Sequence, residues 1–562
     1  MSELRRAGKV VIVGGVAGGM SAATRLRRLD ETAEIVVFEK GDHVSFANCG
    51  LPYFVGGVIE RRDDLLLQTP ESLRARFDLD VRTRHEVIRI DRHRSQVSVR
   101  DLTTGEIASE SFDVLILAAG ARPVDGLEGG GVPVHTLRTI DDIDAITSLL
   151  AGSTCDTRVV VAGGGFIGLE AVENLVRRGV AVTLVQRGDQ PLSPLDPEMA
   201  SPVLDALELH GVDVRLNTEI TELRAGAVML TDGSELAANL VIDARGVVPE
   251  TRLAAETGLA IGPTGGIAVD DFQRTSDPSI YAVGDGVEKR DALDDSATLV
   301  TMAGLANRHG RIAADAICGV GHASEPALGT AIVGVFDLTV AMVGWSERRL
   351  RAAGRAHRVV HTHPSSHAGY YPGAERMALK LLIDPTTDAI LGAQIIGGEG
   401  VDKRIDVIAT AMAGGLTASR LSRLELAYAP QYGSAKDAVN LAGYVADNLA
   451  TGMARSIQWH ELDDALADGA ILVDVRSESE FDRGAIPGAI SIPLDELRDR
   501  WSELGDRPVI VHCHVGQRGH TAARLLAQLA LDVRNLDGGY LTWLAGRASQ
   551  VVSRNRHEGA LQ

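Results

Sequence analysis

Short hydrophobic runs, each followed by glycines and then by a helical pattern, organise the first part of the chain. Residues 10–13 are all β-branched and predict a buried strand, which a glycine-rich turn at 14–18 and a helix follow. Residues 34–40 predict the next strand. The same succession of strand, glycine turn, helix and strand recurs at 158–188. Two such units predict two dinucleotide-binding folds in one chain.

The glycines of both turns have the spacing that a bound pyrophosphate requires, because they let the backbone approach phosphates at the helix N-terminus. The second strand of the first unit ends in Glu39, an acid that can bind a ribose 2′-hydroxyl. The second unit has Gln186 and Arg187 there, which leans slightly toward a 2′-phosphate and hence NADPH. The predicted contacts are Gly14, Gly15, Ala17, Gly18, Glu39 and Lys40 in the first unit, and Gly163, Gly165, Phe166, Ile167, Gly168, Gln186 and Arg187 in the second.

Three more apolar strands end in turns of small residues: FDVLILAAGARP, NLVIDARGVVPET and TSDPSIYAVGDGVE. The last of these turns places Asp285 directly after a strand and a glycine. These turns and the segment around residue 48 contain the remaining cofactor contacts that the family resemblance described below implies, which are Asn48, Ala119, Gly120, Gly246, Gly284 and Asp285.

The pattern changes twice in the second half of the chain. Residues 331–445 predict a separate α+β domain with the strands ALKLLID and AILGAQIIGG, and YVADNLATGMARSIQW predicts a connector. Further on, the strand PVIVHC delivers Cys513 to a turn, and CHVGQR opens a helix. The N–H groups of residues 513–518 can all point at one sulfur, and with Arg518 they favour a thiolate or persulfide anion. The alternative is an inert buried thiol at a strand end.

Composition limits the range of partners and the compartment. The chain has 562 residues and a formal net charge of -20, which disfavours nucleic acid and anionic membrane surfaces as partners. The apolar run before the first glycine turn has only four residues, too few for a signal sequence or a membrane span. Four cysteines are too few for a disulfide scaffold and are typical of a reducing cytosol. We therefore expect a cytoplasmic protein that binds neither membrane nor nucleic acid.

One of these cysteines, Cys49, lies in the decapeptide SFANCGLPYF, and the next along the chain is Cys155. A lone thiol cannot exchange a substrate disulfide for an internal one. Cys49 would instead hold its oxidised state as a mixed disulfide with a small thiol or as a sulfenate. Its nucleophilicity requires a low pKa, which positive or hydrogen-bonding neighbours could supply. The alternative is a small buried hydrophobic residue.

The two nucleotide turns and the late AVGD segment resemble the pyridine nucleotide-disulfide oxidoreductase superfamily over residues 9–445. Residues 470–546 resemble a rhodanese domain, with Asp474 and Arg476 matching that family's structural pair. The decapeptide around Cys49 resembles coenzyme A-disulfide reductases, and their fusion to a rhodanese is a recognisable subgroup linked with persulfide reduction.

The resemblance implies an α/β fold of four domains. These are an FAD-binding domain (1–119 and 246–330), an NAD(P)H-binding domain (120–245), an α+β dimerisation domain (331–446) and, after a linker (447–458), an α/β rhodanese domain (459–550).

The resemblance also implies the chemistry and the assembly. NADH or NADPH reduces FAD, which reduces a mixed disulfide of Cys49 with coenzyme A, while Cys513 delivers sulfane sulfur from a donor. The substrate would be coenzyme A disulfide, coenzyme A persulfide or polysulfide. The chain forms a homodimer in which tyrosines from the partner reach the active cysteine; we assign Tyr370 and Tyr428, with Tyr371 and Tyr432 as adjacent candidates. The implied coenzyme A contacts are Ser21, Arg25, Arg28, Ser45, Asn48 and Lys436.

The first helix carries Arg25, Arg27 and Arg28, which predict a local basic groove for the coenzyme A phosphates; an ordinary solvated basic face is the alternative. Three other functions remain open. They are an NADH oxidase that uses a Cys49 sulfenate, a rhodanese sulfurtransferase with a regulatory flavin module, and a redox sensor without turnover.

No metal site is predicted. The histidines at 512, 514 and 520 match no standard zinc spacing, and those at 361, 363 and 367 are interpreted as a cluster in a surface loop.

Overall fold

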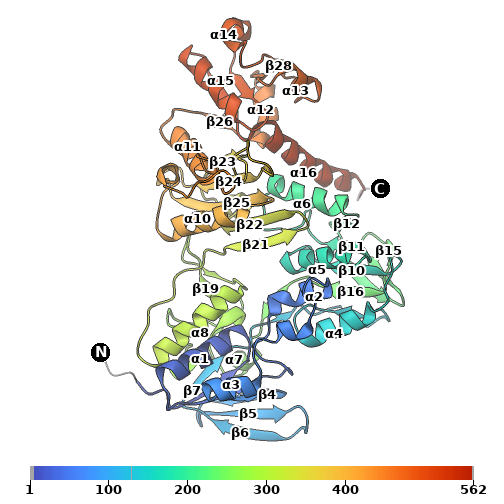
Figure 1. The fold of residues 1–562 in the computed structure, drawn as a ribbon, viewed down its shortest axis with the longest axis vertical. Helices are drawn as coiled ribbons and strands as arrows, with labels where there is room; N and C mark the ends of the chain where they lie inside the picture. The colour runs from blue at the N-terminus through green and yellow to red at the C-terminus, as the bar shows by residue number, and fades with distance from the viewer. Residues whose placement is uncertain (1–4, 128, 560–562) are drawn as a thin grey trace. The chain divides into compact units, whose positions relative to one another are not determined.

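The computed structural model describes residues 5–127 and 129–559, with side chains up to residue 550. The chain divides into two compact units (Figure 1). The N-terminal unit comprises residues up to 185 together with 219–327, and the C-terminal unit comprises 186–218 and the residues from 328 onward. Residues 186–218 lie inside the predicted NAD(P)H-binding domain, yet they group with the C-terminal unit.

The first predicted dinucleotide fold is present in the N-terminal unit. Its parallel sheet has the order β18-β7-β1-β2-β3, formed by Ile280–Ala282, Val114–Leu117, Lys9–Val13, Glu34–Phe38 and Asp80–Arg82. Helix α1 (Ala17–Leu29) packs along α8 (Ala303–Ile317), and the two lie side by side in Figure 1. They approach closely because Gly310 has no side chain: a Cβ there would lie 2.2 Å from the carbonyl oxygen of Gly18.

Short elements connect this sheet to the rest of the N-terminal unit. They are η1 (Asn48–Gly50), α2 (Leu51–Val55), η2 (Arg62–Leu65), α3 (Pro70–Phe77), α7 (Arg252–Glu256), η3 (Gly284–Gly286) and the pair β19–β20 (Lys289–Arg290, Ala297–Thr298). An antiparallel sheet is formed by β4 (His85–Asp91), β5 (Gln96–Asp101) and β6 (Ile107–Ser111). The strands β8 (Ala121–Pro123) and β17 (Val247–Pro249) pair antiparallel. They belong to the two stretches of chain that run between the nucleotide folds, and their pairing connects these stretches.

The second nucleotide fold repeats the first. Its strands pair in parallel in the order β11-β10-β16-β9, formed by Ala181–Gln186, Arg158–Ala162, Leu240–Asp243 and Val134–His135. The helices are α4 (Ile140–Leu149) and α5 (Phe166–Arg177), and β13, β14 and β15 (Ile220–Arg224, Ala227–Leu230, Glu235–Ala237) form an antiparallel sheet. All the strands quoted from the N-terminal part of the sequence are thus confirmed.

The C-terminal unit is built on two sheets. The first is antiparallel, with the order β21-β22-β25-β24-β23, formed by Ala331–Val335, Leu338–Gly344, Ile390–Gly397, Ala378–Ile383 and Arg358–Thr362. Its helices are α9 (Glu347–Ala352), α10 (Val401–Ala413), η4 (Ser419–Arg423) and α11 (Ala438–Ala450). Residues 186–218 contribute α6 (Pro197–Leu209) and β12 (Asp213–Leu216).

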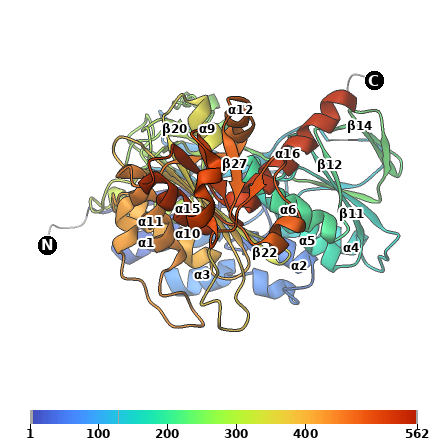
Figure 2. The same cartoon turned by 90° about the horizontal axis from the view of Figure 1, so that it is seen from above.

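The second sheet is parallel, with the order β26-β30-β29-β27-β28, formed by Ser456–Ile457, Val533–Leu536, Val509–His512, Ile471–Asp474 and Ile490–Ser491. Around it lie η5 (Trp459–Glu461), α12 (Leu462–Ala467), α13 (Glu478–Asp482), α14 (Leu497–Arg500), η6 (Trp501–Leu504), α15 (Gln517–Gln528) and α16 (Gly539–Gly559). Helix α16 packs along α6, and the view from above shows the two side by side (Figure 2).

These sheets confirm the predicted α/β fold class, with two Rossmann-like folds, an α+β region and a C-terminal α/β region. The predicted linker 447–458 contains regular structure, because α11 continues to Ala450 and β26 joins the parallel sheet. Among the helices that the structure describes, none combines the length and the apolar character needed to cross a membrane.

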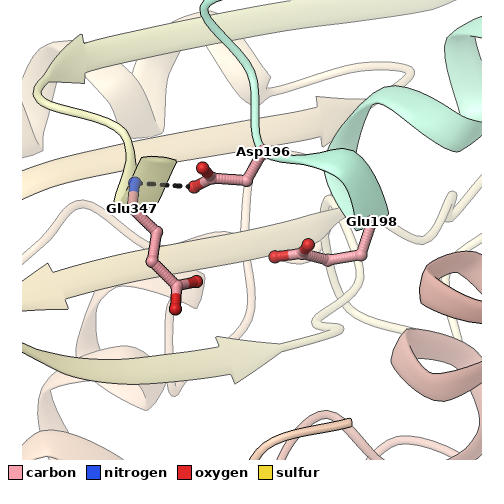
Figure 3. A group of neighbouring side chains, drawn as sticks. All are labelled: Asp196, Glu198 and Glu347. Carbon is pink, nitrogen blue, oxygen red and sulfur yellow. Dashed lines mark hydrogen bonds between the residues drawn. The ribbon is translucent and has the colours of Figure 1, made fainter. Parts of the chain in front are cut away.

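A buried ionic cluster joins the parts of the C-terminal unit. The carboxylates of Asp196, Glu198 and Glu347 lie within 4.8 Å of one another (Figure 3). The ammonium of Lys380, fully buried on β24, lies 2.9, 2.5 and 2.6 Å from these three carboxylates. Although burial alone would raise the pKa of the Glu198 carboxyl, Lys380 and His361 hold it well below its usual range.

Asp196 also fixes the backbone around this cluster. Its carboxylate accepts the N–H groups of Glu347 and Arg348 at 3.0 Å each, and the Nε2 amide of Gln394 at 2.8 Å. Segment 186–218, helix α9 and strands β24 and β25 therefore meet at one group of charges. The three acids resemble a metal site, but the lysine ammonium supplies the positive charge among them.

We predict that Lys380→Met destabilises the C-terminal unit by about 3–5 kcal/mol, because it leaves three buried carboxylates without their cation. The free energy of unfolding of the full-length chain, measured in urea, checks this. Lys403→Met is the matched control: Lys403 is partly exposed and 3.8 Å from Asp437, so its loss should cost less than about 1 kcal/mol. Equal losses in the two variants would contradict the prediction.

Candidate functional site

The first glycine turn forms a cradle for a dinucleotide. Gly14 has a φ of 105°, and a Cβ on it would lie 2.3 Å from the carbonyl oxygen of Ala118, so no other residue fits there. Glu39 accepts the N–H of Gly15 with Oε2 and that of Gly41 with Oε1, both at 2.8 Å. A carboxylate has about four acceptor positions, so Glu39 retains capacity for a ribose hydroxyl.

Asp285 provides the test of whether FAD fits this cradle. Its Oδ1 is buried and has no hydrogen-bond partner, and burial raises the pKa of the carboxyl. Buried acceptors in native proteins are satisfied, so this oxygen matches a hydroxyl from a bound molecule. Gly120 lies beside the same turn, because a Cβ on Gly286 would be 2.8 Å from its carbonyl oxygen. The residues present fit a dinucleotide that carries a polyol chain, as FAD does.

Sequence reasoning missed two buried bases beside Asp285. Lys289 donates to the carbonyls of Gly284 at 2.7 Å and Val287 at 2.8 Å, and burial lowers its pKa to about 8. His309 has a buried Nδ1 without a partner, and burial lowers its pKa to about 4. Lys289 could have been found from its place four residues after Asp285. His309 gave no such signal, because it lies on α8 and only the packing of α8 on η3 brings it there.

The second glycine turn has the same close approaches. A Cβ on Gly163 would lie 2.4 Å from the carbonyl oxygen of Ala244, and one on Gly168 would lie 1.9 Å from that of Gly163. Around Gly165, which precedes α5, there is open space for a ligand. Gln186 and Arg187 belong to the C-terminal unit, so the choice between NADH and NADPH stays a prediction.

Cys49 lies on η1 with an exposed side chain, next to Asn48, whose Nδ2 donates to the carbonyl of Arg138 at 3.3 Å. Partial desolvation and the carboxylates of Glu170 and Asp285 raise the pKa of the Cys49 thiol. The expectation that neighbouring groups lower this pKa is therefore wrong for the N-terminal unit by itself. The physical reason is that the charges acting on the sulfur are negative.

Tyr53 and Glu170 belong to the same surroundings, and sequence reasoning missed both. The Tyr53 hydroxyl donates to Glu170 Oε1 at 3.3 Å, and burial with this carboxylate raises the pKa of Tyr53 to about 12. Burial raises the pKa of Glu170 as well. The pair connects α2, directly after Cys49, with α5 of the second nucleotide fold.

The arginines of α1 divide into different roles. Arg27 is buried and donates to four carbonyls, those of Asp30, Glu31, Phe77 and Asp78, so it supports the fold and does not line a groove. Arg25 pairs with Asp315 at 2.5 Å, and Ser21 donates to Asn307 at 2.7 Å. Arg28 is exposed. The prediction of a basic groove lined by three arginines is thus wrong for Arg27. The positive charge of Arg25 is balanced by a carboxylate.

The C-terminal unit brings the two assigned tyrosines together. The hydroxyls of Tyr370 and Tyr428 are 3.0 Å apart, and the side chains are 77% and 50% exposed. Tyr371 instead packs edge-on against His367, and Tyr432 is exposed. An exposed pair of hydroxyls from two loops can donate hydrogen bonds to one external group.

A buried arginine connects the loop that carries Tyr370 with the loop that carries Tyr428. Arg404, on α10, donates to Asp437 at 2.7 Å and to the carbonyl of Ser366 at 2.8 Å. Ser366 leads into the loop of Tyr370, and Asp437 follows exposed Lys436 at the end of the loop of Tyr428. The two loops also meet directly, since the N–H of Ala368 donates to the carbonyl of Pro430 at 3.2 Å.

The second cysteine site lies in the C-terminal α/β region. Cys513 is fully buried directly after β29, and α15 begins at Gln517. Arg518 forms two hydrogen bonds of 2.7 Å with Glu480, which lower the pKa of that carboxyl to about 2. Glu480 and, beside it, Cys513 raise the pKa of Arg518, so the predicted positive charge acts at this site and is shared with Glu480. The predicted structural pair is present, with Arg476 donating to both oxygens of buried Asp474.

The interpretation of the histidines at 361, 363 and 367 as a surface loop is wrong. His361 is buried within β23, its Nδ1 lies 2.8 Å from Asp537 Oδ2 and its Nε2 lies 3.1 Å from Glu198 Oε1. His367 is also buried, and His363 shares a hydrogen bond of 2.8 Å with Thr542. The alternation expected of a strand is hard to recognise at 358–362, because polar residues occur among the apolar ones. The partners of these polar residues come from other elements, so the local sequence does not reveal them.

Three protein-family models match the chain. Residues 8–306 match the pyridine nucleotide-disulphide oxidoreductase family, residues 330–439 match the dimerisation domain of that family, and residues 458–546 match the rhodanese-like domain. Among curated proteins, coenzyme A disulfide reductases of Staphylococcus aureus are 37% identical over 439 residues, 78% of this chain and 99% of the relative.

Solved structures agree over nearly the whole length. A reduced CoADR-RHD of Bacillus anthracis is 43% identical with a TM-score of 0.94, covering 97% of this chain and 98% of that one. A NAD-dependent persulfide reductase from A. fulgidus is 35% identical with a TM-score of 0.89, covering 95% and 100%. These matches confirm the resemblance first drawn from the motifs: the chain belongs to the pyridine nucleotide-disulphide oxidoreductase family and carries a rhodanese-like domain joined to it.

Proposed function

We propose that the protein reduces coenzyme A disulfide and coenzyme A persulfide with NAD(P)H through one redox cysteine, Cys49. The observation that carries the proposal is an exposed single thiol beside the orphaned acceptor Asp285, whose charge acts on that thiol. The other cysteines of the N-terminal unit are Cys155, exposed in the loop between α4 and β10 of the second nucleotide fold, and buried Cys318. The names of the Staphylococcus and A. fulgidus relatives support both substrate classes.

FAD, held by residues of the cradle such as Gly14, Glu39 and Asp285, would accept a hydride from the nicotinamide and pass an electron pair to a disulfide. The chain's own part is to present Cys49 as a nucleophile. Its thiolate attacks the substrate sulfur, a coenzyme A thiolate or hydrosulfide leaves, and a mixed disulfide of Cys49 with coenzyme A remains. The electron pair then restores the Cys49 thiolate and releases coenzyme A.

The raised pKa of Cys49 supports a dimeric active site. Burial, Glu170 and Asp285 disfavour the thiolate, so hydrogen-bond donors brought to the sulfur by a second subunit would favour it. The exposed hydroxyls of Tyr370 and Tyr428 are suited to this role, either donating to the sulfur or protonating a leaving thiolate. We infer that they act on the Cys49 of the partner subunit in a homodimer, with Lys436, Arg28 and Ser45 among the contacts to coenzyme A.

Cys513 would supply the persulfide. Its thiolate takes a sulfane sulfur from a donor, and the Cys513 persulfide then transfers this sulfur to a coenzyme A thiol. Each transfer breaks one S–S bond and forms one S–S bond: the rest of the donor leaves as an anion in the first step, and the Cys513 thiolate leaves in the second. Because both sites are in one chain, the persulfide reaches Cys49 at an effective concentration of about millimolar.

We predict that Cys49→Ser retains bound FAD and loses coenzyme A disulfide reduction by at least about 10³-fold, because the attacking sulfur is gone. Flavin absorbance and NAD(P)H oxidation check the two parts. Oxygen consumption by the wild type is measured in parallel. Rapid oxygen reduction without turnover of coenzyme A disulfide would favour a Cys49 sulfenate oxidase instead.

For the second site, Cys513→Ala should keep reduction of preformed coenzyme A disulfide within twofold. It should lose at least about tenfold of the NAD(P)H oxidation that thiosulfate or polysulfide supports in the presence of coenzyme A. The two substrates are compared at equal enzyme concentration. A variant equally active with both classes would exclude Cys513 from the relay.

The dimeric site is tested by mixing subunits. The double variant Tyr370→Phe/Tyr428→Phe should lose about 10²-fold in kcat, since general acids contribute that much. Co-expressed with Cys49→Ser, it should form heterodimers in which one site combines an intact cysteine with intact tyrosines of the other chain. We expect recovery to about half of the wild-type rate per dimer. Absence of recovery would show that the tyrosines act within their own chain or not at all.

A further inference from the structure

The loop that carries Cys513 rests on the segment that follows β30. The carbonyl of Cys513 accepts the N–H of Tyr540 at 2.8 Å, and that of His514 accepts the N–H of Leu541 at 3.1 Å. Asn535 Nδ2 donates to the carbonyl of Gly516 at 3.1 Å. Residues 535–541 thus form the floor under residues 513–516. Any displacement of this floor moves the N–H groups that surround the sulfur.

Two consecutive glycines make up the middle of this floor. Gly538 and Gly539 have φ of 65° and 64°. A Cβ on Gly539 would lie 2.5 Å from the carbonyl oxygen of Cys513, and one on Gly538 would lie 2.0 Å from Thr542 Oγ1. Glycine is required there for space, yet it is also the most permissive residue for the backbone. The floor therefore depends on what holds its two ends.

Both ends are held by histidines outside the rhodanese-like domain, namely His361 of β23 and His363 just after this strand. At one end Asp537 Oδ2 accepts the backbone N–H and the Nδ1–H of His361, both at 2.8 Å. At the other end Thr542 Oγ1 and His363 Nε2 share a hydrogen bond of 2.8 Å. Asp537 and Thr542 are 4% and 3% exposed, so water does not replace these contacts.

His361 connects the floor to the Lys380 cluster. Its Nε2 lies 3.1 Å from Glu198 Oε1, the oxygen that Lys380 also contacts. Burial alone would lower the pKa of His361, but the hydrogen bonds with Asp537 and Glu198 raise it to about 9. The ring is thus an imidazolium at neutral pH and donates a hydrogen bond to each carboxylate.

We propose that His361 and His363 are positioning residues for sulfur transfer: they clamp Asp537 and Thr542 on either side of Gly538–Gly539 and so hold the Cys513 loop in its anion-binding shape. The rhodanese-like site is then completed by the dimerisation domain of its own chain. This inference rests on the proposed function of Cys513. Sites of this kind require their backbone donors to be placed within about 0.5 Å, which a loose glycine pair does not provide.

The test uses thiosulfate and cyanide as probes, with the full-length enzyme. The Cys513 thiolate attacks the outer sulfur of thiosulfate and sulfite leaves with the bonding electron pair. Cyanide then removes the sulfur as thiocyanate and restores the thiolate. Reduction of coenzyme A disulfide by the same preparation reports on Cys49 and on folding.

Two substitutions at one position separate the clamp from the charge. In His361→Asn the amide nitrogen occupies the place of Nδ1 and can still donate to Asp537. In His361→Gln it occupies the place of Nε2 and can donate only to Glu198. Both remove the same positive charge beside Lys380. We expect His361→Gln to lose at least about tenfold in kcat for thiocyanate formation, with KM for thiosulfate within twofold, and His361→Asn to retain at least half of kcat.

The other end of the floor supplies a pair of substitutions that scarcely disturbs folding. Thr542→Val keeps the shape of the side chain and removes the hydroxyl, and Thr542→Ser keeps the hydroxyl. The valine variant should lose about fivefold in kcat, the serine variant less than twofold, and both should reduce coenzyme A disulfide at the wild-type rate.

Equal kcat in His361→Gln and His361→Asn, together with an unaffected Thr542→Val, would overturn the proposal. A parallel loss of both activities in every variant would also overturn it, because the residues would then serve general stability. Failure of the Cys513→Ala prediction is a separate outcome. It would rule out the delivery of sulfur from Cys513 to Cys49. The thiosulfate assay would still show whether His361 and His363 position the Cys513 loop.

Discussion

The ammonium of Lys380, placed among three carboxylates, is the interaction on which the C-terminal unit depends. Asp196, Glu198 and Glu347 could not all stay ionised at this separation without a cation between them. Each charged group has lost its hydration on burial, so an arrangement that lacks one of the ion pairs would leave an uncompensated buried charge. It therefore fixes one register of segment 186–218 against α9 and the antiparallel sheet.

The same cluster extends toward the second cysteine site. Glu198 faces His361, and His361 faces Asp537, so a continuous line of buried charges runs from α6 through β23 to the segment under Cys513. Gly538 and Gly539 then connect Asp537 with the residues that contact the Cys513 loop. The loop of Cys513 is in this way supported by the dimerisation domain, the same domain that carries Tyr370 and Tyr428.

The two cysteines occupy opposite electrostatic situations. Cys49 is exposed and surrounded by carboxylates, whereas Cys513 is buried beneath a loop whose arginine is tied to Glu480. Arg518, which interacts with Cys513, has no counterpart among the charges that act on Cys49, which are those of Glu170 and Asp285. The proposed mechanism therefore brings in the tyrosine hydroxyls of a second subunit to stabilise the Cys49 thiolate.

The sequence by itself determined the strands, the glycine turns and the positions of both cysteines, because these are properties of consecutive residues. The glycines at 14 and 163 are part of such local patterns, whereas their close approaches to Ala118 and Ala244 arise only in the tertiary structure. Only the tertiary structure decided the roles of single charged residues. Arg27 supports carbonyls and lines no groove, His361 is a buried strand residue, and the surroundings of Cys49 raise its pKa. Burial and the identity of the partner set the state of a charge, and decisive partners lie far along the chain: Phe77 is 50 positions from Arg27, and Asp537 is 176 positions from His361. The local pattern of hydrophobic and polar residues contains no information about partners so far away along the chain.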